Sequence, residues 1–331
     1  MPTDISAASV PPAGNETATA IRARAFQVGV TLCIINTIIG AGQPVITRWG
    51  AVHLDPLLFC TSAVVFASIC TIPVLYFSGE LRMIVDPRYR ARLFMMSMAG
   101  TVMTSLTLTY GLTRIDAIAG VLLLQTEPVY SLILSTIFVG ERPSARQMLA
   151  TVTILVGIGS VFAGGSFSPL WAAALVFTTP LFWQTSHVLG LKLMPPLTPI
   201  SVTGGRFFYA AIILTVMLLI FRRGSLVQLA DPTSLGVIAV TGLFIYFLSA
   251  LTWFGAINRL SLAWVTALVV PGIPILSILF AVMFLGEHAT TREAIGILIS
   301  VSGVLALVLG ADPHRKQPAS EAVEAIHEPM T

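Results

Sequence analysis

The stretch from Ser144 to Gly164, SARQMLATVTILVGIGSVFAG, is matched 146 residues later by the stretch from Thr290 to Gly310, TTREAIGILISVSGVLALVLG. The same offset relates earlier pairs, namely Pro128 and Pro274, Ser131 and Ser277, Phe138 and Phe284, and Glu141 and Glu287. This correspondence indicates an internal duplication. Two copies that each contain an odd number of membrane-spanning helices must insert in opposite orientations, which gives an inverted repeat.

Composition places the chain in a lipid bilayer. Of its 331 residues 56% are hydrophobic and 10% are charged, and the mean hydropathy is +0.90, which leaves too little polar surface for a soluble fold. The net charge of +3 gives no reason to expect nucleic acid as a partner. Cys33, Cys60 and Cys70 lie in apolar stretches without CxxC spacing, so neither disulfides nor a metal site is predicted, and no cofactor is expected.

A hydrocarbon core about 30 Å thick requires about 20 apolar residues per helix. Applied along the chain, that length predicts spans at 26–47, 56–78, 91–113, 117–139, 146–164, 168–190, 199–221, 233–256, 261–285 and 292–310. The expected fold is therefore an all-α integral membrane protein with ten transmembrane helices arranged as two inverted five-helix repeats. These repeats cover 26–164 and 168–310, and the tails at 1–25 and 311–331 are expected to be disordered.

The distribution of basic residues predicts the orientation. Residues 80–92 contain Arg82, Arg88, Arg90 and Arg92, and positively charged loops stay in the cytoplasm during insertion. This places both termini in the cytoplasm, with a bacterial inner membrane as the expected location. Arg146 and Arg292 are equivalent in the repeat and then lie on opposite sides of the membrane.

The fifth and tenth spans begin with equivalent helix-start signals. Ser144 with Gln147, and Thr290 with Glu293, both fit a capping box. Small residues then recur every seven positions on one face of each helix, at Ala150, Gly157 and Gly164 and at Gly296, Gly303 and Gly310. Such faces permit close helix packing, either within one chain or in a homodimer, and the packing within the chain is favoured.

Two further pairs are expected to have structural or gating roles. Glu141 and Glu287 lie at helix ends, where a carboxylate can be hydrated or can cap a helix. Pro128 and Pro274 lie within spans and remove a backbone N–H donor each. Breaks of this kind near the membrane midplane accompany transporter binding sites, although either proline can equally be a packing kink.

The repeated Val/Leu-Gly-Glu motif near the end of each half resembles the EamA branch of the drug/metabolite transporter superfamily. Tyr110–Ala117 (YGLTRIDA), Leu124–Tyr130 (LQTEPVY), and Trp183 placed nine residues before Lys192 strengthen the resemblance, which covers about residues 26–310. It implies a plasma-membrane exporter of amino acids, other small metabolites or toxic compounds. It also implies a cavity lined by helices one, three, four, six, eight and nine.

Glu127 is the sharpest candidate for a substrate or proton site. It lies about 15 Å along the fourth span, where a carboxylate is costly unless it faces water or a partner. The repeat places Ile273 at the equivalent position, so the fold does not require an acid there, although a buried structural hydrogen bond is the alternative. His187 is a second candidate for proton coupling, although a lone histidine on an apolar helix is more often a buried core residue. The other residues expected to contact substrate are Asn36, Gln43, Tyr110, Tyr130, Trp183, Gln184, Tyr246 and Trp253.

Arg206 is set within a span. It can hold a substrate carboxylate or extend to the membrane interface, and the second alternative is slightly favoured.

The leading hypothesis is a secondary transporter that exports a small zwitterionic or amphipathic molecule, such as an amino acid, or a drug, by alternating access. An importer and a non-transporting scaffold are the alternatives. An enzyme is not expected, because the chain has no HExxH or GxGD motif and no His/Asp pair within a span. A channel is disfavoured because no selectivity loop is recognisable.

Overall fold

The fold is entirely helical in the part of the chain that the structure describes. This structure is a computed structural model, and it describes residues 14–139, 144–162, 169–191, 193, 197–257, 259–260, 265 and 268–309. The first repeat contains α1 (Gly14–His53), α2 (Pro56–Phe77), α3 (Arg90–Ser97), η2 (Met98–Met103), α4 (Thr104–Gly111), α5 (Ala117–Leu124), α6 (Glu127–Val139) and α7 (Ala145–Phe162). The second contains α8 (Leu170–Leu191), α9 (Pro199–Phe221), α10 (Pro232–Val240), η4 (Thr241–Leu248), α11 (Ser249–Ile257), α13 (Gly272–Phe280), η5 (Ala281–Leu285) and α14 (Thr291–Leu309). Two 3-10 helices, η1 (Leu81–Ile84) and η3 (Arg223–Ala230), connect neighbouring spans.

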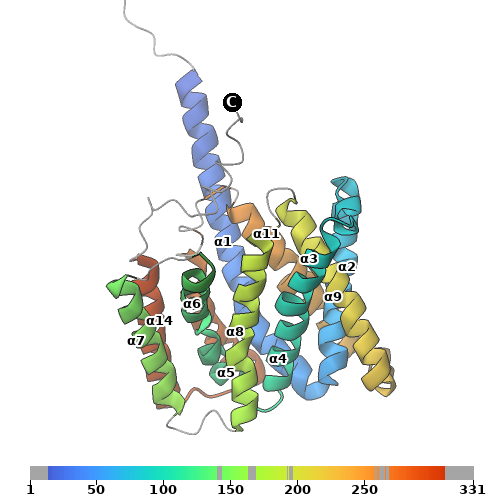
Figure 1. The fold of residues 1–331 in the computed structure, drawn as a ribbon. Coiled ribbons are helices and arrows are strands. Elements are labelled where there is room, and N and C mark those ends of the chain that lie inside the picture. Colours follow the sequence, from blue (N-terminus) through green and yellow to red (C-terminus); the bar gives the residue numbers. More distant parts are fainter. Residues whose placement is uncertain are drawn as a thin grey trace, which may run out of the picture.

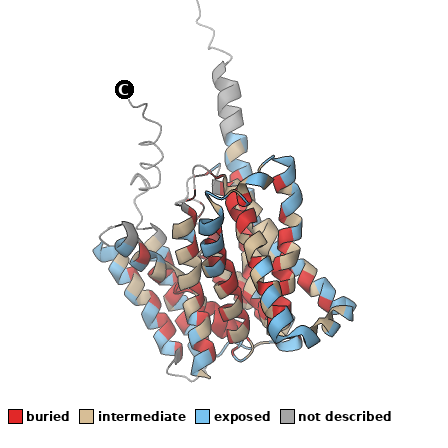
Figure 2. Cartoon of the chain, turned by 45° about the vertical axis from the view of Figure 1, so that its right-hand side comes forward, coloured by how far each residue is buried: buried red, intermediate tan, exposed pale blue. Residues whose placement is uncertain are grey.

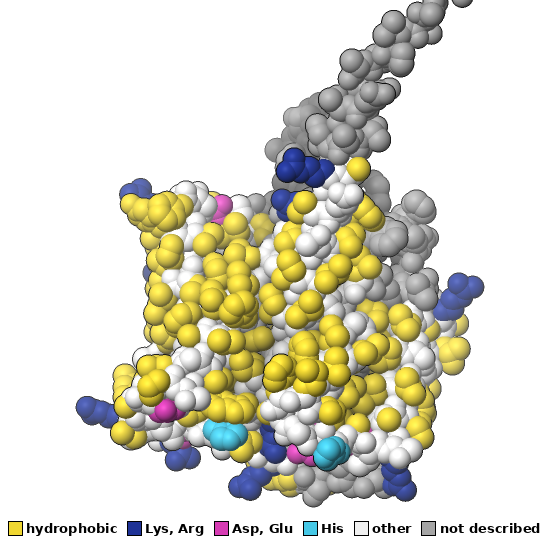
Figure 3. Space-filling model, turned by 180° about the vertical axis from the view of Figure 1, so that it is seen from behind, with side chains coloured by type: hydrophobic (Ala, Val, Ile, Leu, Met, Phe, Trp, Pro, Cys, Tyr) yellow, Lys and Arg dark blue, Asp and Glu magenta, His cyan; other side chains and the backbone are white. Residues whose placement is uncertain are grey.

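The described helices follow the predicted spans and form one bundle (Figure 1), while residues 261–264 and 266–267 of the ninth predicted span lie outside the described residues. Six of the described helices are long and apolar enough to cross a membrane, and 145–161 and 272–285 form shorter apolar helices. Buried residues line the interior of the bundle (Figure 2). One outer face is covered by hydrophobic side chains, with most charged groups toward its two ends (Figure 3). The prediction of an all-α integral membrane fold is confirmed.

The N-terminal helix is longer than predicted. α1 begins at Gly14, so residues 14–25 are helical where a disordered segment was expected, and Figure 1 shows this part projecting from the bundle. Charged and polar residues can continue a helix once an apolar segment has nucleated it, because each added residue gains a hydrogen bond. The predicted tail at 311–331 and residues 1–13 lie outside the described residues.

The fourth span is interrupted next to its proline. α5 ends at Leu124 and α6 begins at Glu127, and the N–H groups of Gln125 and Thr126 donate to the carbonyls of Leu122 and Leu123, at 3.2 Å each. Pro128 therefore lies in the first turn of α6, where a missing N–H costs little. The ninth span is built in the same way, since Pro271 precedes α13 and Pro274 lies in its first turn.

The third and eighth spans share a feature that the apolar pattern did not predict. Each contains a π-helical stretch, η2 at 98–103 and η4 at 241–248, and the offset of 146 residues makes the two overlap. π-Helical turns are rare and recur at functional sites. Their presence in both copies indicates that the duplication preserved this distortion of the backbone.

α7 and α14 pack through their glycine faces, side by side in Figure 1. A Cβ on Gly157 would lie 2.6 Å from the carbonyl oxygen of Gly296, and one on Gly303 would lie 2.9 Å from that of Ala150. Gly296 is the repeat equivalent of Ala150, and Gly303 is the repeat equivalent of Gly157. The two contacts are therefore related by the symmetry of the repeat. The contacts also run in opposite directions along the two helices. Equivalent helices are therefore antiparallel, which is the geometry of an inverted repeat.

The symmetry centre of this seam lies at Ser300, whose hydroxyl donates to the carbonyl oxygen of Ile154 at 3.3 Å across an offset of 146 residues. Both predicted capping boxes are confirmed: Ser144 and Gln147 bond reciprocally at 2.8 and 3.2 Å, and Thr290 and Glu293 do so at 2.8 and 3.2 Å. The small-residue faces considered for a homodimer are thus buried against each other within one chain. The favoured packing within the chain is found for Ala150, Gly157, Gly296 and Gly303, whereas Gly164 and Gly310 lie outside the described residues.

We expect Gly157→Ala to lower the thermal stability of the purified protein, because its Cβ would press on the backbone of α14. Overpacking of this kind costs about 1–3 kcal/mol. Gly159→Ala is the matched control on the same helix, since a Cβ there meets nothing within 4 Å. Thermal unfolding in lipid nanodiscs measures both variants. Equal midpoints for the two would contradict the importance of the seam.

Candidate functional site

The interrupted fourth span places a carboxylate inside the bundle. Glu127 is the first residue of α6, and its Oε1 accepts a hydrogen bond of 2.8 Å from Nε2 of Gln184 on α8. Both side chains are half-buried. The two predicted site residues therefore lie together and connect a helix of the first repeat to a helix of the second. At the equivalent position Ile273 packs against Gly40 of α1, with its Cδ1 3.1 Å from a Cβ built there.

A second polar group surrounds Arg206 on α9. Its Nε is buried without a hydrogen-bond partner among the described residues, and the guanidinium lies within electrostatic range of His187 and Tyr246. The Tyr246 hydroxyl lies 3.3 Å from the hydroxyl of Ser105 on α4. Extension of Arg206 to the interface, the alternative favoured from sequence, would leave its polar atoms hydrated. The Nε is buried inside the bundle while the side chain as a whole is half-buried, so Arg206 is added to the candidate site.

His187 links these two groups along α8. It lies three residues after Gln184, and residues at that spacing share a helix face. His187 is exposed although it lies near Arg206. One face of α8 thus carries the partner of Glu127 and, one turn on, a neighbour of Arg206.

Gln125 is a candidate site residue that was not predicted. Its Nε2 is buried and has no hydrogen-bond partner in the described part of the chain. It lies in the break between α5 and α6, two residues before Glu127. A buried free amide donor at a helix break is a candidate contact for a polar ligand, because buried polar groups are normally paired.

Other predicted residues are held by contacts within the protein. Asn36 on α1 donates from Nδ2 to the carbonyl of Ser249, at 2.8 Å, and to the hydroxyl of Thr252, at 2.9 Å. Trp253 packs against a buried apolar cluster that includes Cys33 and Ala256. Both residues join α1 to α11.

The aromatic candidates are dispersed. Tyr130 packs edge-on against Phe177, with ring centroids 5.7 Å apart. The Tyr110 hydroxyl lies near Arg222 and Asp55, which form an ion pair of 3.6 Å at one end of the bundle. Tyr110 is thus separated from the Glu127 group. Gln43 and Trp183 are half-buried.

Glu287 caps a helix of the other repeat. Its Oε1 and Oε2 accept from the backbone N–H groups of Ala117 and Ile118, at 2.8 and 3.0 Å, so the carboxylate sits at the N-terminus of α5. Arg48 lies nearby, donating to the carbonyl of Leu112 at 2.5 Å and pairing with Asp116 at 3.4 Å. We call the bonds of Glu287 to α5 the Glu287 contact. Glu141, its repeat equivalent, lies outside the described residues.

A comparable contact joins the halves elsewhere. Oε2 of Glu80, after α2, accepts hydrogen bonds from the hydroxyls of Thr198 and Ser201, the latter at 2.6 Å. Thr198 is the N-cap of α9, so this carboxylate also lies at a helix N-terminus of the opposite repeat. We call this the Glu80 contact.

Comparison with known proteins fits this architecture. The family model described as "EamA-like transporter family" matches residues 27–163 and 170–309. The chain belongs to the EamA-like transporter family. Membership of this family makes the protein a membrane transporter, and the resemblance expected from the sequence is confirmed.

Several relatives support the assignment of this EamA-like protein. An uncharacterized transporter YoaV of Bacillus subtilis is 22% identical over 84% of this chain and 96% of its own length. An uncharacterized transporter of Archaeoglobus fulgidus is 22% identical over 66% of this chain and 77% of its own length. The uncharacterized protein PA1977 of Pseudomonas aeruginosa is 29% identical over 61% of this chain and 68% of its own length. A crystal structure with a TM-score of 0.61 and 15% identity covers 87% of this chain and 98% of that chain, which shows a shared fold.

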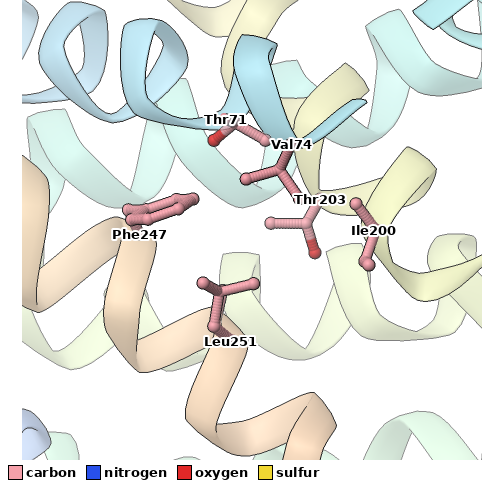
Figure 4. Close-up of a pocket in the computed structure, with 7 residues that line it drawn as sticks. Thr71, Val74, Ile200, Thr203, Phe247 and Leu251 are labelled. Carbon is pink, nitrogen blue, oxygen red and sulfur yellow. The ribbon is translucent and has the colours of Figure 1, made fainter. Parts of the chain in front are cut away.

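A small pocket of this EamA-like chain is lined by neither Glu127 nor Arg206. Thr71 and Val74 on α2, Ile200 and Thr203 on α9, and Phe247 and Leu251 from η4 and α11 line it (Figure 4). The Thr71 hydroxyl donates to its own helix at Ala67. The lining has no charged side chain, so the pocket offers no recognition of a charged substrate.

The stability of this EamA-like protein should depend on pH through Glu287. Burial raises the pKa of its carboxyl above the ordinary 4.5, and the two N–H donors offset this only in part. A raised folded pKa gives a contribution to stability that is full below the ordinary pKa and is lost as the pH rises through the raised value. We therefore expect the difference in melting midpoint between wild type and Glu287→Ala to shrink as the pH rises above 4.5. A difference that does not change with pH would contradict this assignment.

Proposed function

We propose that this EamA-like transporter works by alternating access and exports a small zwitterionic or amphipathic metabolite, such as an amino acid, or a drug. The halves that move are 26–164 and 168–310, both termini are cytoplasmic, and the membrane is a bacterial inner membrane. The observation that carries the proposal is the pair of carboxylate contacts at Glu80 and Glu287. Each contact joins the two halves.

The topology supports opposite positions for the two contacts. Three spans separate Ala117 from Thr198, and an odd number of spans places the two helix N-termini at opposite ends of the bundle. Alternating access requires a closure at each end of a central site, and each closure must be able to open while the other is shut. A carboxylate at a helix N-terminus is a suitable closure, because hydrogen bonds to a charged group are worth about 1.5–3 kcal/mol and exchange readily with water.

The central site of the proposal is the group formed by Glu127 and Gln184, at the break in the fourth span. Helix breaks free backbone groups for ligands where they line a cavity. His187, Tyr246 and Gln125 extend this group with further polar atoms. Glu127 is proposed to bind the substrate or to carry a coupled proton.

Counterflow in reconstituted vesicles tests the function. Vesicles are loaded with one of a panel of amino acids, nucleosides and cationic drugs, and uptake of the labelled compound is measured. We expect saturable uptake that is accelerated by the same compound inside. Flux without saturation would indicate a channel, and no flux of any compound would indicate a scaffold. Uphill movement toward the face that carries Glu80 would indicate an importer.

A further inference from the structure

Arg206 forms no ion pair with the described residues. The described residues include two ion pairs, Arg48 with Asp116 and Arg222 with Asp55, and neither involves Arg206. Its Nε is buried and makes no hydrogen bond to the described residues. A half-buried cation whose Nε has no partner among the described residues is costly inside a bundle, and a ligand from outside the chain can supply the missing partner.

Among the described residues, the groups that interact with Arg206 include no carboxylate. His187 and Tyr246 face it from α8 and η4, and the guanidinium carbon lies 5.1 Å from the centre of the Phe207 ring. The ring offers a partial cation–π attraction, which does not replace a counter-charge. The hydroxyl pair of Tyr246 and Ser105 adds hydrogen-bonding groups beside the guanidinium.

Arg206 lies at the depth of the central group. It is seven residues from the start of α9 at Pro199, and Gln184 is seven residues from the end of α8 at Leu191. These two helix ends are joined by a short connection, so both residues lie about 10 Å from the same end of the bundle. A ligand held by Arg206 would therefore be level with Gln184, which binds Glu127.

We infer that Arg206 binds the carboxylate of the transported substrate. This inference rests on the proposed function and narrows its substrate class to carboxylate-bearing molecules. The planar guanidinium presents its N–H donors in a fork that matches a carboxylate in a two-point contact. A polyphosphate would need several clustered cations, whereas Arg206 is a single one. Glu127 then faces the remainder of the substrate, and a positively charged amino group suits it.

The test compares carboxylates with the corresponding amides, which lack the carboxylate charge. Purified full-length protein is heated with each of the twenty common amino acids, with their amides, and with benzoate and benzamide at constant ionic strength, because a ligand that binds the folded state raises the midpoint. We expect at least one acid to stabilise the wild type and its amide to have no effect. Arg206→Gln should weaken binding of that acid at least tenfold, and Arg206→Lys should weaken it less. Arg82→Gln removes one positive charge from an exposed position and should leave binding unchanged.

Three outcomes would overturn the inference: equal stabilisation by acid and amide, unchanged binding in Arg206→Gln, or no stabilisation by any of these carboxylates. If Arg206→Gln does not fold, the acid-to-amide comparison in the wild type and the Arg206→Lys variant decide. Counterflow separates this result from the proposed function. If the acid binds specifically but no counterflow is observed, the role of Arg206 is supported and the transporter proposal is overturned. If acid and amide show equally rapid counterflow, the transporter proposal is supported and the role of Arg206 is overturned.

Discussion

Glu127→Gln is expected to abolish uphill efflux or to uncouple it from its driving ion while membrane insertion remains intact. The substitution keeps the shape of the side chain and removes its charge and one acceptor oxygen. The 2.8 Å hydrogen bond from Gln184 then has a neutral amide carbonyl as its acceptor in place of a carboxylate. Loss of a charged hydrogen bond costs about 1.5–3 kcal/mol, which corresponds to a reduction in transport of about 10- to 100-fold. The readout is substrate accumulation in inside-out vesicles, in which export from the cytoplasmic face appears as uptake, measured across a pH range.

The control for Glu127→Gln is Asp86→Asn. Asp86 lies in the loop between η1 and α3, where it accepts from the N–H of Arg88, so the variant removes one negative charge outside the spans. Its efflux should equal that of wild type. Unchanged uphill efflux and unchanged pH dependence in Glu127→Gln would eliminate the acid from the mechanism.

Glu80→Ala and Glu287→Ala are expected to open opposite ends of the transporter. Each variant deletes two hydrogen bonds to a carboxylate that cross between the halves. At about 1.5–3 kcal/mol per charged bond, the balance of open and closed forms should shift at least tenfold. The variant His187→Cys, in a background in which Cys33, Cys60 and Cys70 are replaced, reports access of a reagent to the interior of the bundle. An impermeant thiol reagent should react faster from the face that carries Glu287 in Glu287→Ala, and faster from the other face in Glu80→Ala.

Asp231→Ala is the matched control for these two variants. The Asp231 carboxylate also sits at a helix N-terminus, where it accepts from the N–H and hydroxyl of Ser234 at 2.8 and 2.7 Å, but both residues belong to the same half. It should therefore leave the sidedness of labelling unchanged. Acceleration from the same face in Glu80→Ala and Glu287→Ala would rule out the proposed pair of closures.

The sequence predicted the elements and missed several of their partners. The capping boxes at Ser144 and Thr290 were predictable because both members of each box lie three residues apart. The partner of Glu287 was not predictable, because Ala117 lies 170 residues away and is contacted through its backbone. The repeat suggested that Glu287 would be hydrated or would cap the helix that follows it. The fold brings a helix start of the other half to it instead.

The candidate site was partly predictable, because its residues can be recognised from the sequence while their long-range partners cannot. Glu127 was identified by its polarity within an apolar span, and Gln184 by its place on a polar face, but their pairing depends on how helices four and six pack. Asn36 has the same signature in the sequence, yet its amide bonds to Ser249 and Thr252. Polarity within a span identifies a residue that needs a partner. It does not say whether that partner is protein or ligand.

The seam between α7 and α14 has a consequence for how such a chain can arise. Residues related by the repeat meet on its axis, as Ile154 and Ser300 do, so each helix presents to the other nearly the surface that it receives. A polypeptide of half this length would carry a self-complementary face, provided that a second copy entered the membrane upside down. Fusion of the two copies into one chain ensures that every protein contains one copy in each orientation. It also frees the two halves to diverge, so that an acid can stand at 127 while its counterpart at 273 remains isoleucine.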